Sequence, residues 1–209
     1  MSVIAATDPA LANASLADTS LADTSRAFGR NRDLVQREIS EVFNRVDPAQ
    51  VAALVTELRL ADRIFVTGAG RSGLVLKMAA MRLMHLGRAV HVVGETTAPA
   101  ISAGDVLLAA SGSGTTSSVV KAAQTAAAQG ARVAVYTTNP GSPLAEAASA
   151  VVVIPAAQKT DHGSAVSRQY SGSLFEQVLF TTTEAVFQIL WDEEAIAPED
   201  LWLRHANLE

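Results

Sequence analysis

The feature that most constrains the fold of this chain is an alternation of short apolar runs with longer segments of helical composition. The runs are rich in β-branched residues, are bounded by turn-forming residues, and occupy residues 63–67, 89–93, 106–110, 132–137 and 150–154. They are apolar on both alternating faces, which is typical of strands that are covered on both sides. Because helical segments such as 73–86 and 116–129 lie between several of them, the pattern predicts a three-layer α/β/α sandwich with a five-stranded parallel sheet.

Helical periodicity also precedes and follows the predicted sheet. Apolar residues recur at helical spacing between residues 28 and 46, and Asp47-Pro48 then supplies an N-cap followed by proline at the first helical position. Two helices are therefore expected before the first strand. A polar, irregular stretch at 155–172 leads into a further helical pattern at 173–191. Ligands of open parallel sheets bind at the carboxyl ends of the strands, so we expect the functional site there.

The first 25 residues differ in composition from the rest. They are rich in Ala, Ser, Thr and Asp, and they contain the sequence Leu-Ala-Asp-Thr-Ser twice, at 16–20 and 21–25. A five-residue unit is too short to be a structural repeat, so we expect a mobile leader without a specific function. Residues 26–209 are long enough for one globular domain, and we expect them to form a single one.

Composition excludes several classes of protein. The chain has no cysteine, so it has neither disulfides nor a thiolate metal site. Its net charge is −5 without a basic block, which disfavours a nucleic-acid-binding surface. Its apolar stretches are interrupted well before the ~18 residues that a membrane helix needs, and no signal peptide is recognisable. We therefore expect a cytoplasmic protein whose partners include neither nucleic acid nor membrane.

Two glycine-rich loops follow predicted strands. The first, Gly68 to Gly73, fits the dinucleotide pattern G-x-G-x-x-G, and Glu95 lies beyond the next strand. The same glycines serve any sharp turn that brings backbone N–H groups to an anion, so a dinucleotide site and a general anion site both remain open.

The second loop, Ser111 to Thr116, places four hydroxyls and two glycines directly before a predicted helix. Helix capping requires only one such hydroxyl. Hydroxyl groups together with the amides at a helix N-terminus favour a phosphate ligand, and this loop could hold a phosphomonoester without lysine or metal. No Lys follows Gly114, which excludes the P-loop that binds nucleoside triphosphates.

Several motifs together resemble the sugar isomerase (SIS) domain family, in particular its 6-phospho-3-hexuloisomerase branch. The matching stretches are Gly-Ala-Gly-Arg-Ser-Gly at 68–73, Met-Arg-Leu-Met-His-Leu-Gly at 81–87, Val-Gly-Glu-Thr-Thr-Ala-Pro at 93–99, Ser-Gly-Ser-Gly at 111–114, Gly-Ser-Leu-Phe-Glu-Gln at 172–177 and Arg-His-Ala-Asn-Leu-Glu at 204–209. The resemblance spans residues 28–209. It departs from the family at Thr115, where Glu is usual, and at Tyr170-Ser171, where a Pro is usual.

The resemblance implies a flavodoxin-like sandwich and an enzyme of the ribulose monophosphate pathway of formaldehyde fixation, which interconverts D-arabino-hex-3-ulose 6-phosphate and fructose 6-phosphate. It assigns the proton-transferring base to Glu176, and it implies no cofactor or metal. The phosphate would be held by the hydroxyls of Ser72, Ser111, Ser113, Thr115 and Thr116 and by the backbone at Gly70, Gly112 and Gly114. An isomerase of another phosphosugar and a non-catalytic sugar-phosphate sensor remain alternatives.

Three further residues are candidates for catalysis. Arg71 in the first loop could stabilise the negative charge of the substrate. His85 lies 13 residues beyond Ser72, roughly 20 Å along one helix, so it cannot reach the phosphate site of its own chain. His205 belongs to the terminal motif. The resemblance implies a homo-oligomer, commonly a tetramer, and we expect His85 or His205 to approach the Ser111 to Thr116 loop of another subunit.

Overall fold

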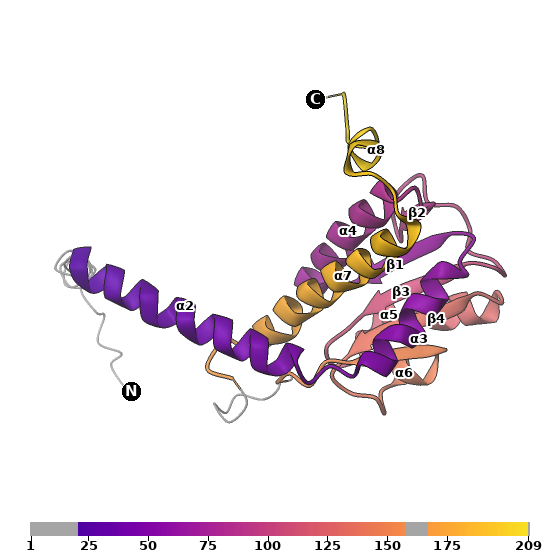
Figure 1. The fold of residues 1–209 in the computed structure, drawn as a ribbon. Coiled ribbons are helices and arrows are strands. Elements are labelled where there is room, and N and C mark those ends of the chain that lie inside the picture. Colours follow the sequence, from indigo (N-terminus) through magenta and orange to yellow (C-terminus); the bar gives the residue numbers. More distant parts are fainter. Residues whose placement is uncertain (1–20, 158–166, 209) are drawn as a thin grey trace, which may run out of the picture. The chain divides into compact units, whose positions relative to one another are not determined.

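The computed structural model describes residues 21–157 and 167–208 and shows an α/β protein (Figure 1). Its elements in chain order are α2 (Leu21–Phe43), α3 (Pro48–Arg59), β1 (Ile64–Gly68), α4 (Gly70–His85), β2 (Val90–Val92), β3 (Val106–Ala110), α5 (Ser117–Ala128), β4 (Arg132–Thr137), α6 (Pro143–Glu146), β5 (Ala150–Val153), α7 (Ser173–Glu194) and α8 (Pro198–Trp202). The five predicted strands are all present, each within one residue of its expected bounds.

The sheet is parallel throughout, with the strand order β2-β1-β3-β4-β5. This is the flavodoxin-like doubly wound order, in which the chain reverses direction across the sheet after β2. The predicted fold class is therefore confirmed. In the register between β1 and β3, Gly68 lies opposite Ala110, so these two strands end side by side.

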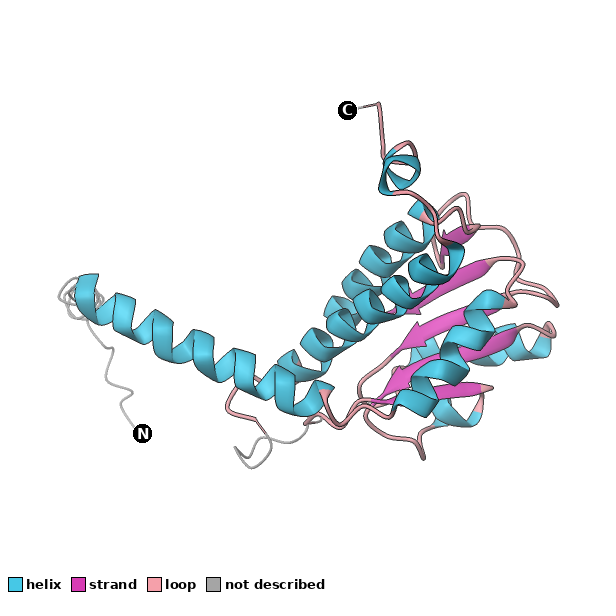
Figure 2. Ribbon diagram, in the orientation of Figure 1, coloured by secondary structure: helices cyan, strands magenta, loops and turns pink. Residues whose placement is uncertain are grey.

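Helices cover both faces of the sheet and create two apolar cores (Figure 2). One core joins the sheet to α3, α4 and α7, and fully buried members include Leu54, Leu76 and Leu179. The other core joins the opposite face to α5 and α6, with Leu107 and Leu144 nearly inaccessible. Burial of these side chains is the main favourable term in the stability of the sandwich.

Local signals account for the helix boundaries that the sequence predicted correctly. The Asp47 carboxylate accepts a 2.8 Å hydrogen bond from the amide of Ala49, and Pro48 occupies the first turn of α3. This is the expected cap, because proline has no N–H to leave unpaired there. Helix α7 runs three residues past the expected end at 191 and ends where Ala195 adopts a left-handed conformation, with φ of 49°.

The described part of the chain begins with a long helix. The chain divides into a unit Met1–Glu38 and a unit Ile39–Glu209. Helix α2 begins at Leu21, so the second copy of the Leu-Ala-Asp-Thr-Ser repeat is helical. Within this helix, Asp23 and Arg26, which are about one turn apart, form an ion pair. The first copy lies outside the described residues. A leader that ends at residue 25 remains a prediction.

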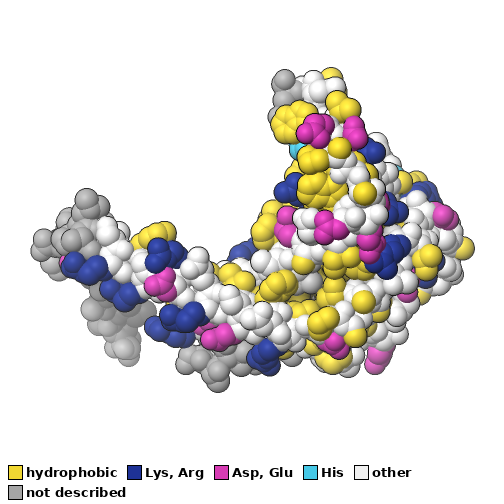
Figure 3. All heavy atoms as spheres, in the orientation of Figure 1, with side chains coloured by type: hydrophobic (Ala, Val, Ile, Leu, Met, Phe, Trp, Pro, Cys, Tyr) yellow, Lys and Arg dark blue, Asp and Glu magenta, His cyan; other side chains and the backbone are white. Residues whose placement is uncertain are grey.

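Charges of both signs are mixed on the drawn surface. On the face drawn in Figure 3, Lys and Arg side chains are interspersed with Asp and Glu. Across residues 21–157 and 167–208, every helix is too short or too polar to cross a bilayer.

Candidate active site

The two glycine-rich loops leave the carboxyl ends of neighbouring strands. The first connects β1 to α4, and the second connects β3 to α5. A Cβ atom on Gly73 would lie 2.5 Å from the carbonyl oxygen of Gly68, so only glycine lets the first turn of α4 pack this closely on the end of β1. This close approach brings Gly70, Arg71 and the buried Ser72 to the edge of the sheet beside the second loop.

The hydroxyls of the second loop hold one another in place. Ser111 Oγ and Thr116 Oγ1 lie 2.9 Å apart, and the amide of Gly114 donates to Ser111 Oγ over 3.2 Å. The hydroxyl of Thr115 donates to Ser113 Oγ over 2.9 Å. Thr116 occupies the N-cap of α5 but makes no side-chain hydrogen bond to the helix. Helix capping therefore does not account for these hydroxyls.

The backbone of this loop is fixed against β4. The Gly112 carbonyl accepts hydrogen bonds from the amide of Thr138 over 2.9 Å and from its hydroxyl over 2.8 Å. Gly114 has a φ of 67°, and a Cβ atom there would lie 2.0 Å from Ser142 Oγ. Position 114 therefore requires glycine, for backbone conformation and for space.

Helix α7 brings a carboxylate to the same edge. Glu176 lies in its first turn and is 4% exposed. Arg71 Nε lies 3.1 Å from Glu176 Oε2, and Arg71 Nη1 donates to Ser173 Oγ over 3.2 Å. A Cβ atom on Gly112 would lie 3.4 Å from the ring of Phe175, so the start of α7 also contacts the hydroxyl loop. The structure thus brings together Glu176, Arg71 and both loops.

Two contact residues of this site were not identified from the sequence. Ser173 holds Arg71, and Phe175 contacts Gly112. The signal for Ser173 was its position at the start of a helix that carries a candidate base three residues later. Nothing in the local sequence indicates that Phe175 packs against a loop more than 60 residues earlier.

The two candidate histidines lie at the other end of α4. The rings of His85 and His205 stack with their centroids 4.0 Å apart, and Trp202 lies 4.6 Å from His205. Arg204 Nη1 donates to the carbonyl of His85 over 2.7 Å. Burial lowers the pKa of His85 below its usual value, and the nearby His205 and Arg82 lower that pKa further. Within one chain, these histidines lie at the opposite end of α4 from the two loops, so their catalytic role stays a prediction.

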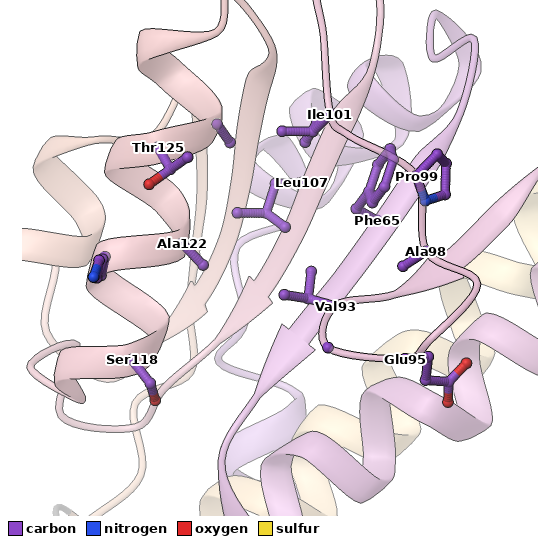
Figure 4. A pocket seen from close by; sticks show the side chains of 13 residues that line it. Phe65, Val93, Glu95, Ala98, Pro99, Ile101, Leu107, Ser118, Ala122 and Thr125 are labelled. Carbon is purple, nitrogen blue, oxygen red and sulfur yellow. The ribbon is translucent and has the colours of Figure 1, made fainter.

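A separate cavity lies on the α5 side of the sheet (Figure 4). It has a volume of about 490 Å³ and is lined mainly by apolar side chains, among them Phe65, Leu107 and Ile101. Its charged lining residues are Glu95 and Lys121, and it includes none of the predicted site residues. Within residues 21–157 and 167–208, no three His, Asp or Glu residues cluster in a way that could hold a metal ion.

This combination of a doubly wound sandwich, a hydroxyl-rich loop at a helix N-terminus and a buried carboxylate defines a protein that binds sugar phosphates. The SIS domain model matches residues 57–180, and the chain belongs to the SIS family. It is 66% identical over 179 residues to 3-hexulose-6-phosphate isomerase of Mycobacterium gastri, which covers 86% of this chain and 90% of that protein. It is 39% identical over 157 residues to the Bacillus subtilis (strain 168) protein of the same name, covering 75% of this chain and 85% of that one.

A solved structure agrees with these relatives. The crystal structure of a hypothetical protein from Methanococcus jannaschii superposes with a TM-score of 0.74 at 27% identity, covering 86% of this chain and 99% of that one. A molecular function of 3-hexulose-6-phosphate isomerase has been inferred for that protein from its structure. Membership of the SIS family is therefore confirmed.

Proposed function

We propose that this protein is an isomerase that interconverts D-arabino-hex-3-ulose 6-phosphate and fructose 6-phosphate. The observation that carries the proposal is the buried carboxylate of Glu176, held by Arg71 beside the hydroxyl-rich loop. The 66% identical relative bears the name 3-hexulose-6-phosphate isomerase and is matched over nearly its whole length.

The phosphate group would bind between the two loops. Its oxygens would accept hydrogen bonds from the hydroxyls of Ser72, Ser111, Ser113 and Thr116, and the N-termini of α4 and α5 would add partial positive charge. Thr115 would act through Ser113, because its hydroxyl already donates to that residue. Anchoring at the phosphate fixes C2 and C3 relative to the base, which gives proton transfer the orientation it requires.

The reaction moves a carbonyl group from C3 to C2. Glu176 takes the proton from C2, and the electrons of the broken C–H bond form the C2–C3 double bond while the C3 carbonyl becomes an enediolate oxygen. The enediolate then collapses: the proton of the C2 hydroxyl passes to the C3 oxygen, which becomes the C3 hydroxyl, C2 becomes the carbonyl, and Glu176 returns to C3 the proton that it took from C2. Arg71, 58% exposed beside Glu176, would stabilise the enediolate charge.

The subunits would assemble into a homo-oligomer, which we expect to be a tetramer. His85 or His205 of one subunit would then act at the Ser111 to Thr116 loop of another, because neither ring lies at this loop in its own chain. We place the protein in the cytoplasm and in the ribulose monophosphate pathway of formaldehyde fixation, because that pathway forms the proposed substrate.

A coupled assay tests this function directly. The purified protein would be offered D-arabino-hex-3-ulose 6-phosphate, arabinose 5-phosphate and sedoheptulose 7-phosphate side by side. We expect turnover of the first sugar only. Turnover of one of the other two would assign a different phosphosugar to this site. Binding of a sugar phosphate without turnover of any of the three would indicate a sensor and overturn the enzymatic proposal.

A further inference from the structure

The connection between β2 and β3 crosses one face of the sheet without forming a helix. Residues 93–105 pass over β1 on the side that carries α5, and they contain only turns and irregular backbone. A crossover between parallel strands is usually helical, so this face lacks the cover that a helix would give. The result is the cavity of about 490 Å³ between this loop and α5, lined by Phe65 of β1 and Leu107 of β3 (Figure 4).

Hydrogen bonds fix the loop that forms one wall of the cavity. The guanidinium of Arg63 donates to the carbonyl of Ala100 and to Ser102 Oγ, each over 3.1 Å. Asp105 holds this guanidinium in turn, with 2.6 Å between Nη2 and Oδ2. The same guanidinium lies 5.4 Å from the centroid of the Phe65 ring. Loop and floor are therefore held by the fold itself, and the cavity is preformed.

One face of α5 forms the opposite wall. Ser118, Lys121, Ala122 and Thr125 line the cavity and recur at intervals of three and four residues. Residues at this spacing project from the same side of a helix. Two hydroxyls and one ammonium group thus border a cavity whose other lining residues are mainly apolar.

The positive charge of Lys121 is uncompensated. Lys121 takes part in none of the ion pairs of residues 21–157 and 167–208. The other charged lining residue, Glu95, has Lys77 at 3.9 Å, and in Figure 4 its carboxylate points away from Leu107. The cavity therefore combines an apolar surface with a cation that has no anion beside it.

We infer that this cavity binds a small amphipathic anion, with an apolar body of about one or two rings and one anionic group. The body packs on Phe65 and Leu107, and the anionic oxygens accept hydrogen bonds from Lys121 and from the hydroxyl of Ser118. A volume of about 490 Å³ lies within the range of ~300–1,000 Å³ in which proteins hold small organic ligands. The lining includes no residue of the sugar-phosphate site, so the inference does not rest on the proposed function.

Titration calorimetry with two matched probes tests this ligand class. 2-Naphthoate and 2-naphthamide have nearly the same shape, but only the first carries a charge. We expect naphthoate to bind at one site per chain, about tenfold more tightly than naphthamide, because only its carboxylate can pair with the ammonium of Lys121. Saturating fructose 6-phosphate should not displace it. Equal affinities, no measurable binding up to about 1 mM, or displacement by the sugar phosphate would overturn the inference.

Variants locate the probe in the cavity. Lys121→Gln should weaken naphthoate binding about fivefold or more, whereas Arg45→Gln, which removes an exposed cation outside the cavity, should not. Ala122→Leu fills the cavity from α5 and should also weaken binding, and Ala127→Leu is its control at an exposed position of the same helix.

Two outcomes of these titrations would contradict the inference. Unchanged affinity in both cavity variants would place the probe on another surface. Binding that appears only after the protein is diluted to monomers would show that a second copy of the chain covers the cavity.

Discussion

Arg71 and Glu176 form an ion pair in which the carboxylate is 5% exposed and the guanidinium is 58% exposed. A buried carboxylate is costly unless it is paired, and Arg71 supplies that partner. Because most of the guanidinium remains in contact with solvent, it can also turn toward a substrate without leaving its helix. The pair therefore combines a buried carboxylate with a largely exposed guanidinium.

Glu176→Gln preserves the size and hydrogen-bonding capacity of the side chain but removes the proton acceptor. We expect kcat to fall about a hundredfold or more with little change in KM, because the interaction lost is needed in the transition state. The matched control is Glu184→Gln, which removes a carboxylate of the same helix that lies 3.7 Å from Arg82. Near-normal turnover of Glu176→Gln in the coupled assay would remove this residue from the mechanism.

Removing Ser111 and Ser113 hydroxyls tests the anchoring of phosphate. In the Ser111→Ala, Ser113→Ala double variant, each charge-assisted hydrogen bond lost should weaken substrate binding by about 1.5–3 kcal/mol, mostly as a raised KM. Thr125→Ala is the control, because it deletes a hydroxyl of α5 that lines the separate cavity. An unchanged KM in the double variant would place the phosphate elsewhere.

Gly114→Ala should destabilise the fold and disrupt the phosphate loop. Alanine is strained at a φ of 67°, and its Cβ would collide with Ser142 Oγ. We expect a loss of more than about 1 kcal/mol in the free energy of unfolding, measured by urea denaturation. Gly29→Ala is the control, and it should not destabilise the fold. Nothing lies within 4 Å of the added Cβ, and position 29 lies inside helix α2, where alanine is favoured over glycine. Equal stabilities of the two variants would contradict the requirement for glycine at position 114.

His85 should make stability depend on pH. Its folded-state pKa lies below the ordinary value of 6.5, because the folded state disfavours its charged form. Above the unfolded pKa the ring is neutral in both states, so it has no effect. As the pH falls through 6.5, the unfolded chain takes up the proton first, and the folded state loses relative stability until the lower folded pKa is reached.

Denaturation curves between about pH 5 and 8 measure this dependence. We expect His85→Gln to flatten the decline on the acidic side. Arg82→Gln should reduce the decline in part, because Arg82 contributes to the lowered pKa of His85. An identical acid-side decline in the parent protein and in His85→Gln would show that other groups control it.

Hybrid oligomers test whether the active site is shared between subunits. If His205 acts in a neighbouring subunit, Glu176→Gln and His205→Ala chains should each be inactive alone. Mixed after subunit exchange, they should regain part of the activity, because some sites then contain one intact copy of each residue. If the monomer is fully active, the complete site lies within one chain. The same conclusion follows if the His205→Ala variant is inactive and the mixed oligomers also remain inactive.

Much of the fold is determined by local sequence. The β-branched runs predicted all five strands, and Asp47-Pro48 predicted the start of α3, because these signals depend on backbone preferences of neighbouring residues. The differences lie at element ends and in the short helices α6 and α8, which were not predicted from the sequence. Helix α4 begins at Gly70 rather than at residue 73, and α2 begins seven residues before the expected position 28, since glycine and small polar residues give weak local signals within a helix.

The sequence by itself therefore determined the order of elements, the composition of both loops and, through the family resemblance, the identity of the candidate base. Only the tertiary structure decided which of these residues meet. Glu176 reaches Arg71 across more than a hundred residues because α7 packs against α4 on one face of the sheet. The stacking of His85 on His205, away from both loops, likewise depends on how the segment after α7 packs against the end of α4. Such contacts arise from strand order and helix packing, which local preferences do not encode.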